Sequence, residues 1–294
     1  MSVFNKIVLF ILRSQLSGWH EGTIAEQRTR QERSTRFLRS PKQVRFQKTS
    51  DPGVPSEWIE LSGSEPGIIL YLHGGAFALG SVNSHREFIS RVVKETNCKA
   101  LAVNYRLAPE NPFPAALDDA IKAYEWLLNN GYRPSQICIA GDSAGGGLTI
   151  STLLALQEKG IPLPAGVFCF SPWFDLMLSG NSIIENEKVD PILSGEVLKK
   201  YTEYYIGDHQ PTEHFISPLF ADLNGLPPLL IHSGRDEILL DDSVRFYEKA
   251  RNAGVDVSLT IWDDMFHVFQ LFSFLPATKE SLKQFSAFVS QLIS

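Results

Sequence analysis

The sequence predicts an α/β protein in which helices cover both faces of a mostly parallel β-sheet. From about residue 41 onward, short apolar segments typical of strands alternate with longer segments of helical periodicity. Several of the strand segments are continuously apolar, as expected for parallel strands that are buried on both faces. The 294 residues are 44% hydrophobic and 20% charged, a composition that argues against a disordered chain or a coiled coil.

Eight segments have the composition of strands. The first two are separated by Asp51, Pro52 and Gly53, which is typical turn chemistry. We expect strands at 43–48, 57–61, 67–72, 100–104, 137–140, 166–170, 229–232 and 257–262. We expect the main helices at 84–96, 115–129, 144–158, 241–253 and 278–292.

A long segment without a good strand pattern follows Phe174. It extends to about Ser217 and contains Pro191 and an amphipathic stretch at 195–205. An insertion of this length over a sheet is usually a lid or a cap. We therefore expect a helical cap made of residues 1–40 and 175–216, and an α/β core made of residues 41–174 and 217–294.

Charge is distributed unevenly along the chain. The net charge is −6, which gives no general case for nucleic-acid binding. Residues 1–50 hold ten basic and three acidic side chains (+7), so the other 244 residues carry −13. The apolar residues at 3–11 have helical spacing, which fits either a helix packed on the protein body or a basic helix on a membrane surface. We favour the packed helix.

Targeting signals and metal-binding patterns are not evident. The apolar run at 7–12 is too short for a secretory signal or a membrane span. We therefore expect a cytoplasmic protein in which Cys98, Cys138 and Cys169 are free thiols, Cys138 and Cys169 being buried. The cysteine spacing matches no metal site, and we expect no metal and no cofactor.

The segment 141–146 (GDSAGG) is the most specific chemical signal. It fits G-x-S-x-G and stands between a buried strand and a helix, the context in which that pattern holds a nucleophilic serine. The strained turn requires very small neighbours, and the helix amino terminus favours developing negative charge. Ser143 is therefore the predicted nucleophile, and Asp142 is expected to hold the turn through hydrogen bonds.

The segment 72–77 (LHGGAF) directly follows a buried strand. It therefore lies at the same edge of the sheet as Ser143, and its small residues allow backbone N–H groups to approach a reacting oxygen. We expect the oxyanion to be bound by the N–H groups of Gly75, Ala76 and Ala144, with Gly74 supplying the bend.

A nucleophilic serine needs a general base, and His267 is the candidate among seven histidines. It stands in a loop five residues after the last strand. No strand delivers His20, His85, His209 or His214 to the site, His73 belongs to the 72–77 loop, and His232 lies within an apolar strand.

The predicted acid is Asp236, the first carboxylate after the strand at 229–232. It would accept the second imidazole N–H of the base. Glu237, Asp241 and Asp242 compete for this role, although the last two are expected to begin the next helix. The order Ser143, Asp236, His267 matches that of the α/β-hydrolases.

With these residues the chain resembles the hormone-sensitive-lipase-like family of α/β-hydrolases, the bacterial carboxylesterases, over about residues 43–290. The resemblance rests on the segments 71–80 (YLHGGAFALG), 104–115 (NYRLAPENPFPA), 141–146, 171–175 (SPWFD) and 233–242. It implies an α/β-hydrolase fold, a metal-independent esterase for short to medium acyl esters, and a cap built partly from the amino terminus. Family members often dimerise through the last strand and helix, so a homodimer is possible for this chain.

One residue departs from the family pattern, which has His-Gly-Gly-Gly where this chain has Ala76. We expect the N–H of Ala76 to remain available and the methyl group to exclude a positive φ at this position. The segment 104–114 is interpreted as a structural brace, in which Arg106 and Glu110 are candidates for an ion pair.

The sequence therefore predicts a serine carboxylesterase that acts on small-molecule esters. Apolar cap residues, such as Phe4, Ile7, Ile183, Ile184 and Leu193, are expected to line the pocket. A lactone or arylformamide hydrolase on the same site, a membrane-active lipase, and a non-catalytic receptor of the same fold remain alternatives. Retention of Ser143, Asp236 and His267 argues against the receptor.

Overall fold

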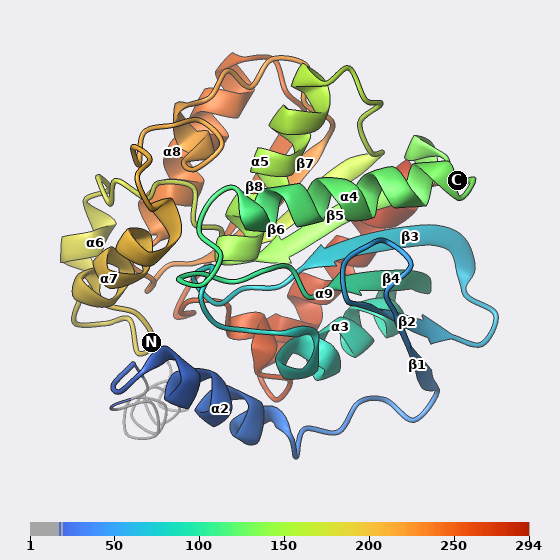
Figure 1. Cartoon of the computed structure of the whole chain (residues 1–294), viewed down its shortest axis with the longest axis horizontal. Coiled ribbons are helices and arrows are strands. Elements are labelled where there is room, and N and C mark those ends of the chain that lie inside the picture. Colours follow the sequence, from blue (N-terminus) through green and yellow to red (C-terminus); the bar gives the residue numbers. More distant parts are fainter. Residues whose placement is uncertain (1–17, 19, 294) are drawn as a thin grey trace.

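A computed structural model describes residue 18 and residues 20–293, and it confirms a mostly parallel sheet of eight strands in this part of the chain (Figure 1). The predicted strands are all present. Their bounds are β1 Val44–Thr49, β2 Ser56–Leu61, β3 Glu65–Leu72, β4 Cys98–Val103, β5 Ile137–Asp142, β6 Gly166–Phe170, β7 Leu229–Gly234 and β8 Val257–Trp262.

The strands follow the order β1-β2-β4-β3-β5-β6-β7-β8 across the sheet. The pairs β1–β2 and β2–β4 are antiparallel, and all the other neighbours are parallel. Strands β3 and β5 through β8 therefore end at one edge of the sheet. This shared edge brings together the loops that follow Leu72, Asp142, Gly234 and Trp262.

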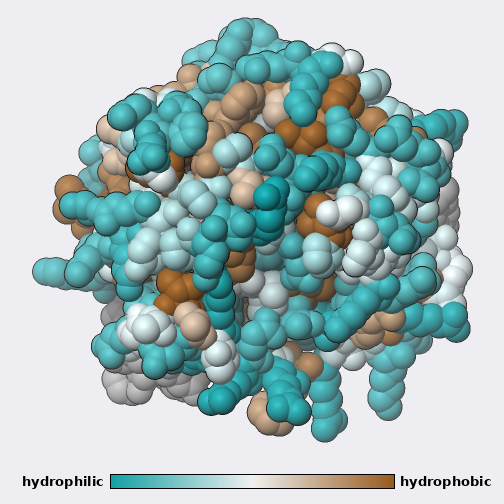
Figure 2. All heavy atoms as spheres, viewed as in Figure 1, coloured by the Kyte–Doolittle hydropathy of each residue, from teal (hydrophilic) through white to brown (hydrophobic). Residues whose placement is uncertain are grey.

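Helices cover both faces of the sheet, and each face has its own apolar core. One core contains residues of α4 (Ala115–Asn129), α5 (Ala144–Glu158) and α8 (Leu240–Asn252), and the other contains residues of α3 (Val82–Thr96) and α9 (Pro276–Leu292). Helix α5 lies almost entirely inside the protein, since thirteen of its fifteen residues are buried. The face drawn in Figure 2 is mostly hydrophilic, with small and separate apolar patches.

Three further helices are α2 (Ile24–Thr35), the short α6 (Ser182–Glu185) and α7 (Gly195–Ile206). Thr23 is the N-cap of α2: its side chain accepts a hydrogen bond from the backbone N–H of Glu26, and the carboxylate of Glu26 accepts one from the N–H of Thr23. In Figure 1, α6 and α7 lie at the left of the sheet and α2 lies below them.

Long-range hydrogen bonds connect α2 to helix α7 and to the loop that follows β3. The hydroxyl of Tyr201 in α7 donates to Gln27 (2.6 Å) and lies 3.0 Å from Nδ1 of His20. Arg28 donates to the carbonyl oxygen of Ala78 (2.8 Å) and also pairs with Glu110 (2.7 Å). Helix α2 therefore lies over the loop that follows β3.

Arg28 also explains why one predicted ion pair is wrong. Glu110 pairs with Arg28 and not with Arg106, whose guanidinium instead contacts Asp119 in α4 (2.8 Å). The sequence could not show this, because α2 reaches Glu110 from 82 residues away.

The apolar spacing at residues 3–11 lies outside the described residues. Among the helices of the described part, none is long and apolar enough to cross a membrane.

Candidate active site

Ser143 lies at the turn between β5 and α5. Its backbone has φ 53° and ψ −123°, a region that non-glycine residues rarely adopt. The turn is crowded, since a Cβ atom on Gly141 would lie 2.3 Å from the carbonyl oxygen of Gly145, and a Cβ on Gly145 would lie 2.0 Å from that of Leu72. This crowding is the physical reason for the glycines on either side of Ser143.

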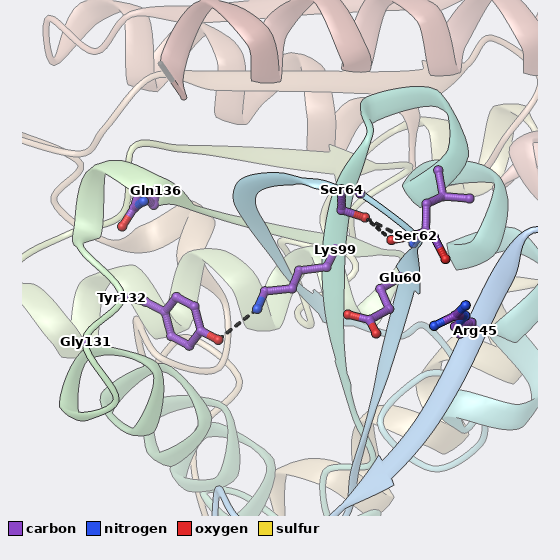
Figure 3. Close-up of a pocket in the computed structure, with 10 residues that line it drawn as sticks. Arg45, Glu60, Ser62, Ser64, Lys99, Gly131, Tyr132 and Gln136 are labelled. Carbon is purple, nitrogen blue, oxygen red and sulfur yellow. Dashed lines mark hydrogen bonds between the residues drawn. The ribbon is translucent and has the colours of Figure 1, made fainter.

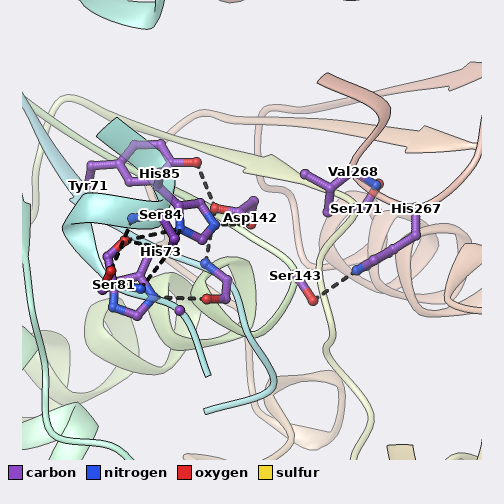
Figure 4. Close-up of polar contacts among 12 residues, drawn as sticks. Tyr71, His73, Ser81, Ser84, His85, Asp142, Ser143, Ser171, His267 and Val268 are labelled. Carbon is purple, nitrogen blue, oxygen red and sulfur yellow. Dashed lines mark hydrogen bonds and ion pairs between the residues drawn. The ribbon is translucent and has the colours of Figure 1, made fainter. Parts of the chain in front are cut away.

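His267 comes from the loop after β8, and its imidazole Nε2 lies 2.9 Å from the hydroxyl oxygen of Ser143 (Figure 4). The two residues are 124 positions apart in the sequence, and both are buried. The backbone next to His267 is held as well, because the N–H of Val268 donates to the hydroxyl of Ser171 (3.0 Å). The structure thus brings together the predicted nucleophile and the predicted base.

The prediction of Asp236 as the partner of His267 is wrong. Nδ1 of His267 instead lies 3.1 Å from Oε2 of Glu237, whose side chain is fully buried. An ionised carboxylate only accepts hydrogen bonds, so Nδ1 carries the proton and Nε2 accepts from the hydroxyl of Ser143. Asp236 is only partly buried, and burial together with the charge of Asp264 raises the pKa of its carboxyl.

The error has a local cause. Strand β7 extends to Gly234, and the N–H groups of Arg235 and Asp236 donate to the carbonyls of Trp262 and Met265 in the neighbouring loop. In the turn that follows, side-chain direction no longer alternates with a fixed period, so the first carboxylate is not the one that faces inward. A usable signal was available, since Glu237 stands directly before the apolar run 238–240.

The loop after β3 has the expected small residues but not the expected backbone at Ala76. Ala76 adopts φ 52°, whereas the sequence led us to expect that its methyl group would exclude a positive φ. The N–H groups of Gly75, Ala76 and Ala144 have no hydrogen-bond acceptor among the described residues. The N–H of Gly74 is already used, because it donates to Asp142 (3.0 Å).

Asp142 is the centre of a buried polar network behind this loop (Figure 4). Its carboxylate accepts from the hydroxyl of Tyr71 (2.7 Å) and from Gly74, and it pairs with Nε2 of His85 (3.3 Å). Burial raises the pKa of Asp142, but the charge and hydrogen bond of His85, together with the hydrogen bond from Tyr71, outweigh that effect and lower the pKa overall. Burial likewise lowers the pKa of His85, and the carboxylate of Asp142 reverses the shift to an upward one.

The remaining histidines are not placed as bases for Ser143. Burial and the nearby charge of His85 lower the pKa of His73 to about 3, and its ring stacks on Tyr105. His232 is buried beside Ser281, and burial lowers its pKa to about 3. His209 and His214 pair with exposed carboxylates and do not line the cavity beside Ser143. His20 lines this cavity, but its two ring nitrogens contact the hydroxyl of Tyr201 (3.0 Å) and the carbonyl of Ile192 (3.1 Å).

A cavity of about 130 Å³ opens beside Ser143 and His267. Its wall is mainly apolar, and its aliphatic and tyrosine side chains are those of Ala76, Leu79, Ile192, Leu193, Leu198, Tyr201, Val268 and Leu271. Of the predicted lining residues that the structure describes, only Leu193 is found there. Ile183 is buried in the core and Ile184 is 82% exposed, while Phe4 and Ile7 lie outside the described residues.

A larger hollow of about 670 Å³ lies around Lys99, between Tyr132 and Glu60 (Figure 3). It is close to the start of β4 and β5, and therefore at the opposite edge of the sheet from Ser143. Its lining contains no histidine that could serve as a base. The smaller cavity is therefore the candidate active site. Within the described part of the chain, no group of side chains is arranged to hold a metal ion.

Known proteins of similar sequence and structure hydrolyse esters. Residues 69–271 match the family model described as alpha/beta hydrolase fold. The chain is 40% identical to an acetyl-hydrolase of Streptomyces hygroscopicus over 80% of this chain and 79% of that protein. It is also 40% identical to an esterase of Acinetobacter venetianus, over 82% and 80%. A solved esterase of the bacterial hormone-sensitive lipase family superposes with a TM-score of 0.96 at 38% identity, over 100% and 99% of the two chains.

Proposed function

Since this chain belongs to the α/β-hydrolase family and is a carboxylic ester hydrolase, we propose that Ser143, His267 and Glu237 are its catalytic triad. The observation that carries this assignment is the contact of 2.9 Å between Nε2 of His267 and the hydroxyl oxygen of Ser143. Glu237 holds the imidazole in the tautomer that can accept the serine proton, and it stabilises the imidazolium that forms.

The geometry supports a mechanism through an acyl-enzyme. His267 takes the proton of Ser143 as the serine oxygen attacks the ester carbonyl, and it then returns that proton to the departing alcohol. The N–H groups of Gly75, Ala76 and Ala144 bind the oxyanion, because no described protein group accepts from them. Gly75 and Ala76 line the cavity together with Ser143, and Ala144 is the next residue in the chain. Water then hydrolyses the acyl-enzyme by the same route.

The preferred acyl group is short. The cavity of about 130 Å³ is small, since pockets for larger ligands commonly have volumes of about 300–1,000 Å³. This volume fits acyl groups of about two to four carbons, and the apolar wall suits their alkyl part. We infer that α2 and α7, which contribute Gln31, Leu198 and Tyr201 to the wall of this cavity, belong to the cap that the sequence predicts for residues 1–40 and 175–216.

A chain-length series of nitrophenyl esters tests the proposal. Acetate to butyrate esters should be hydrolysed with a higher kcat/KM than the octanoate ester, because the longer chain exceeds the cavity. Ser143→Ala should lower kcat by at least about 10⁴-fold, as loss of a nucleophile does in serine hydrolases. Activity that survives in this variant would contradict the proposed nucleophile, and equal rates for all chain lengths would contradict the proposed acyl pocket.

The alternatives rank below this proposal for a structural reason. A receptor that had lost catalysis has no need for a serine hydroxyl aligned on a histidine and a buried carboxylate. Lactones and arylformamides would use the same triad, and including both in the ester series separates them. The cytoplasmic location, the homodimer and the membrane contact stay predictions from the sequence.

A further inference from the structure

Three polar side chains of the segment 182–190 hold the loop that carries Glu237. The hydroxyl of Ser182 donates to the carbonyl of Ile238 (2.7 Å), and the amide of Asn186 donates to the carbonyl of Glu237 (2.9 Å). Asp190 accepts from the N–H of Ile238 (3.0 Å). These three residues are four positions apart in the sequence, and they satisfy consecutive backbone groups of the acid loop.

Asp190 differs from the other two because it is a buried carboxylate with a second attachment. It is 7% exposed, and its other oxygen accepts from the N–H groups of Ile192 (2.8 Å) and Leu193 (3.1 Å). Both of those residues line the cavity beside Ser143. One carboxylate therefore connects the wall of the substrate cavity to the loop that carries the catalytic acid.

The hydrogen bonds of Asp190 fit its ionised form. All three partners are N–H donors, so a protonated carboxyl would leave its own O–H facing donors. Burial raises the pKa of Asp190 to about 6, and the charge of His267 acts against that rise. Above this value Asp190 is a second negative charge acting on the imidazole, in addition to Glu237.

We propose that Asp190 is a positioning residue of the reaction, which holds the Glu237 loop against the cavity wall and stabilises the imidazolium form of His267. This inference rests on the proposed triad. During catalysis the imidazole gains a positive charge while Ser143 attacks, so a second carboxylate close by favours that step. Among the described residues, His267 is the charged group that acts on Asp190. Glu237 directly precedes Ile238, whose N–H donates to Asp190, and on the cap side Nε2 of His20 contacts the carbonyl of Ile192 (3.1 Å).

Asp190→Asn tests this role because it keeps the size of the side chain and removes its charge. We expect kcat/KM at pH 8 to fall about 10- to 100-fold, the cost of a small misplacement of catalytic groups. We also expect the acid limb of the kcat/KM profile to move to lower pH by about half a unit or more, because the imidazolium loses a stabilising charge. An acid limb at the wild-type position would overturn the proposal.

Ser182→Ala is the matched control, since it loosens the same loop at Ile238 without removing a charge. It should lower kcat/KM and leave the acid limb where it is in the wild type. If both variants give the same profile, Asp190 only holds the loop, and its proposed effect on His267 is wrong.

The wild-type protein offers a second measurement that does not depend on a variant that folds. Below about pH 6 protonation of Asp190 removes the charge that Asp190→Asn removes, and adds a loss of up to 10- to 100-fold to the loss of the general base, so log kcat/KM should fall with a slope steeper than one over that range. A slope of one, measured with enzyme that regains full activity at pH 8, would contradict the inference. Failure of the triad itself would look different, because activity would then persist in Ser143→Ala.

Discussion

Two buried histidine–carboxylate pairs lie on either side of Ser143, and they differ in what their ring nitrogens contact. In the pair of His267 and Glu237, one ring nitrogen faces the carboxylate and the other faces the nucleophile. In the pair of His85 and Asp142, Nε2 faces the carboxylate, while Nδ1 contacts the hydroxyl of Ser84 (2.9 Å) and the carbonyl of Ser81 (3.2 Å).

This difference distinguishes a histidine that can transfer a proton, His267, from one that supports a loop, His85. Both nitrogens of His85 are occupied by protein groups, so this ring cannot exchange a proton with a substrate. Its charge instead balances Asp142, which holds Gly74 and thereby the loop with the free N–H groups. A buried histidine beside a carboxylate therefore indicates a base only where its second nitrogen faces a reacting group.

The largest expected effect concerns the acid of the first pair. Glu237→Gln should lower kcat by about 10³- to 10⁴-fold, because the amide favours the wrong imidazole tautomer, as in the corresponding serine protease variant. Asp236→Asn is the matched control. Its kcat should stay within about threefold of the wild-type value, because Asp236 is not part of the proposed triad. Steady-state kinetics on nitrophenyl acetate measure both variants. A larger loss of kcat in Asp236→Asn than in Glu237→Gln would mean that Asp236 is the catalytic acid.

Removing the cation of the second pair should affect stability more than chemistry. His85→Leu leaves the carboxylate of Asp142 buried without a countercharge, which costs about 3 kcal/mol or more of unfolding free energy. The control is His214→Leu, whose partner Glu158 is exposed, so its cost should stay below about 1 kcal/mol. Urea unfolding at pH 6 compares the two. Equal costs would mean that the pair at Asp142 is no more important than a surface contact.

The pH dependence of the same pair follows from the direction of its shifts. The pKa of His85 is raised by Asp142. The contribution of His85 to the unfolding free energy is therefore complete below about pH 6.5, the pKa of a free histidine, and it is lost as the pH rises through the raised pKa. The pKa of Asp142 is lowered by His85, so its contribution is lost only in acid. The stability difference between the wild type and His85→Leu should therefore shrink from pH 6 to pH 9. A difference that is constant over this range would argue against a charged His85.

The smallest expected effect concerns the loop that Asp142 supports. Ala76→Gly should raise the unfolding free energy by about 0.5–1 kcal/mol, because a residue at positive φ is strained when it carries a Cβ atom. Gly75→Ala should do the opposite, since its Cβ would lie 2.3 Å from the carbonyl oxygen of Leu79. Thermal melts resolve both changes, and a lower melting temperature for Ala76→Gly would contradict the strain.

The sequence by itself predicted the sheet and the main helices, and it identified Ser143 and His267, which the structure brings together. Buried strands and amphipathic helices have a periodic pattern of apolar residues, and the crowded turn at Ser143 requires glycines on both sides. These features can therefore be predicted from short segments of the sequence. Only the tertiary structure decided that Glu237 and not Asp236 faces His267, that His85 pairs with Asp142, and that Asp190 joins the cap segment to the acid loop. Side chains in turns follow no fixed period, and contacts between segments tens of residues apart exist only once the chain has folded.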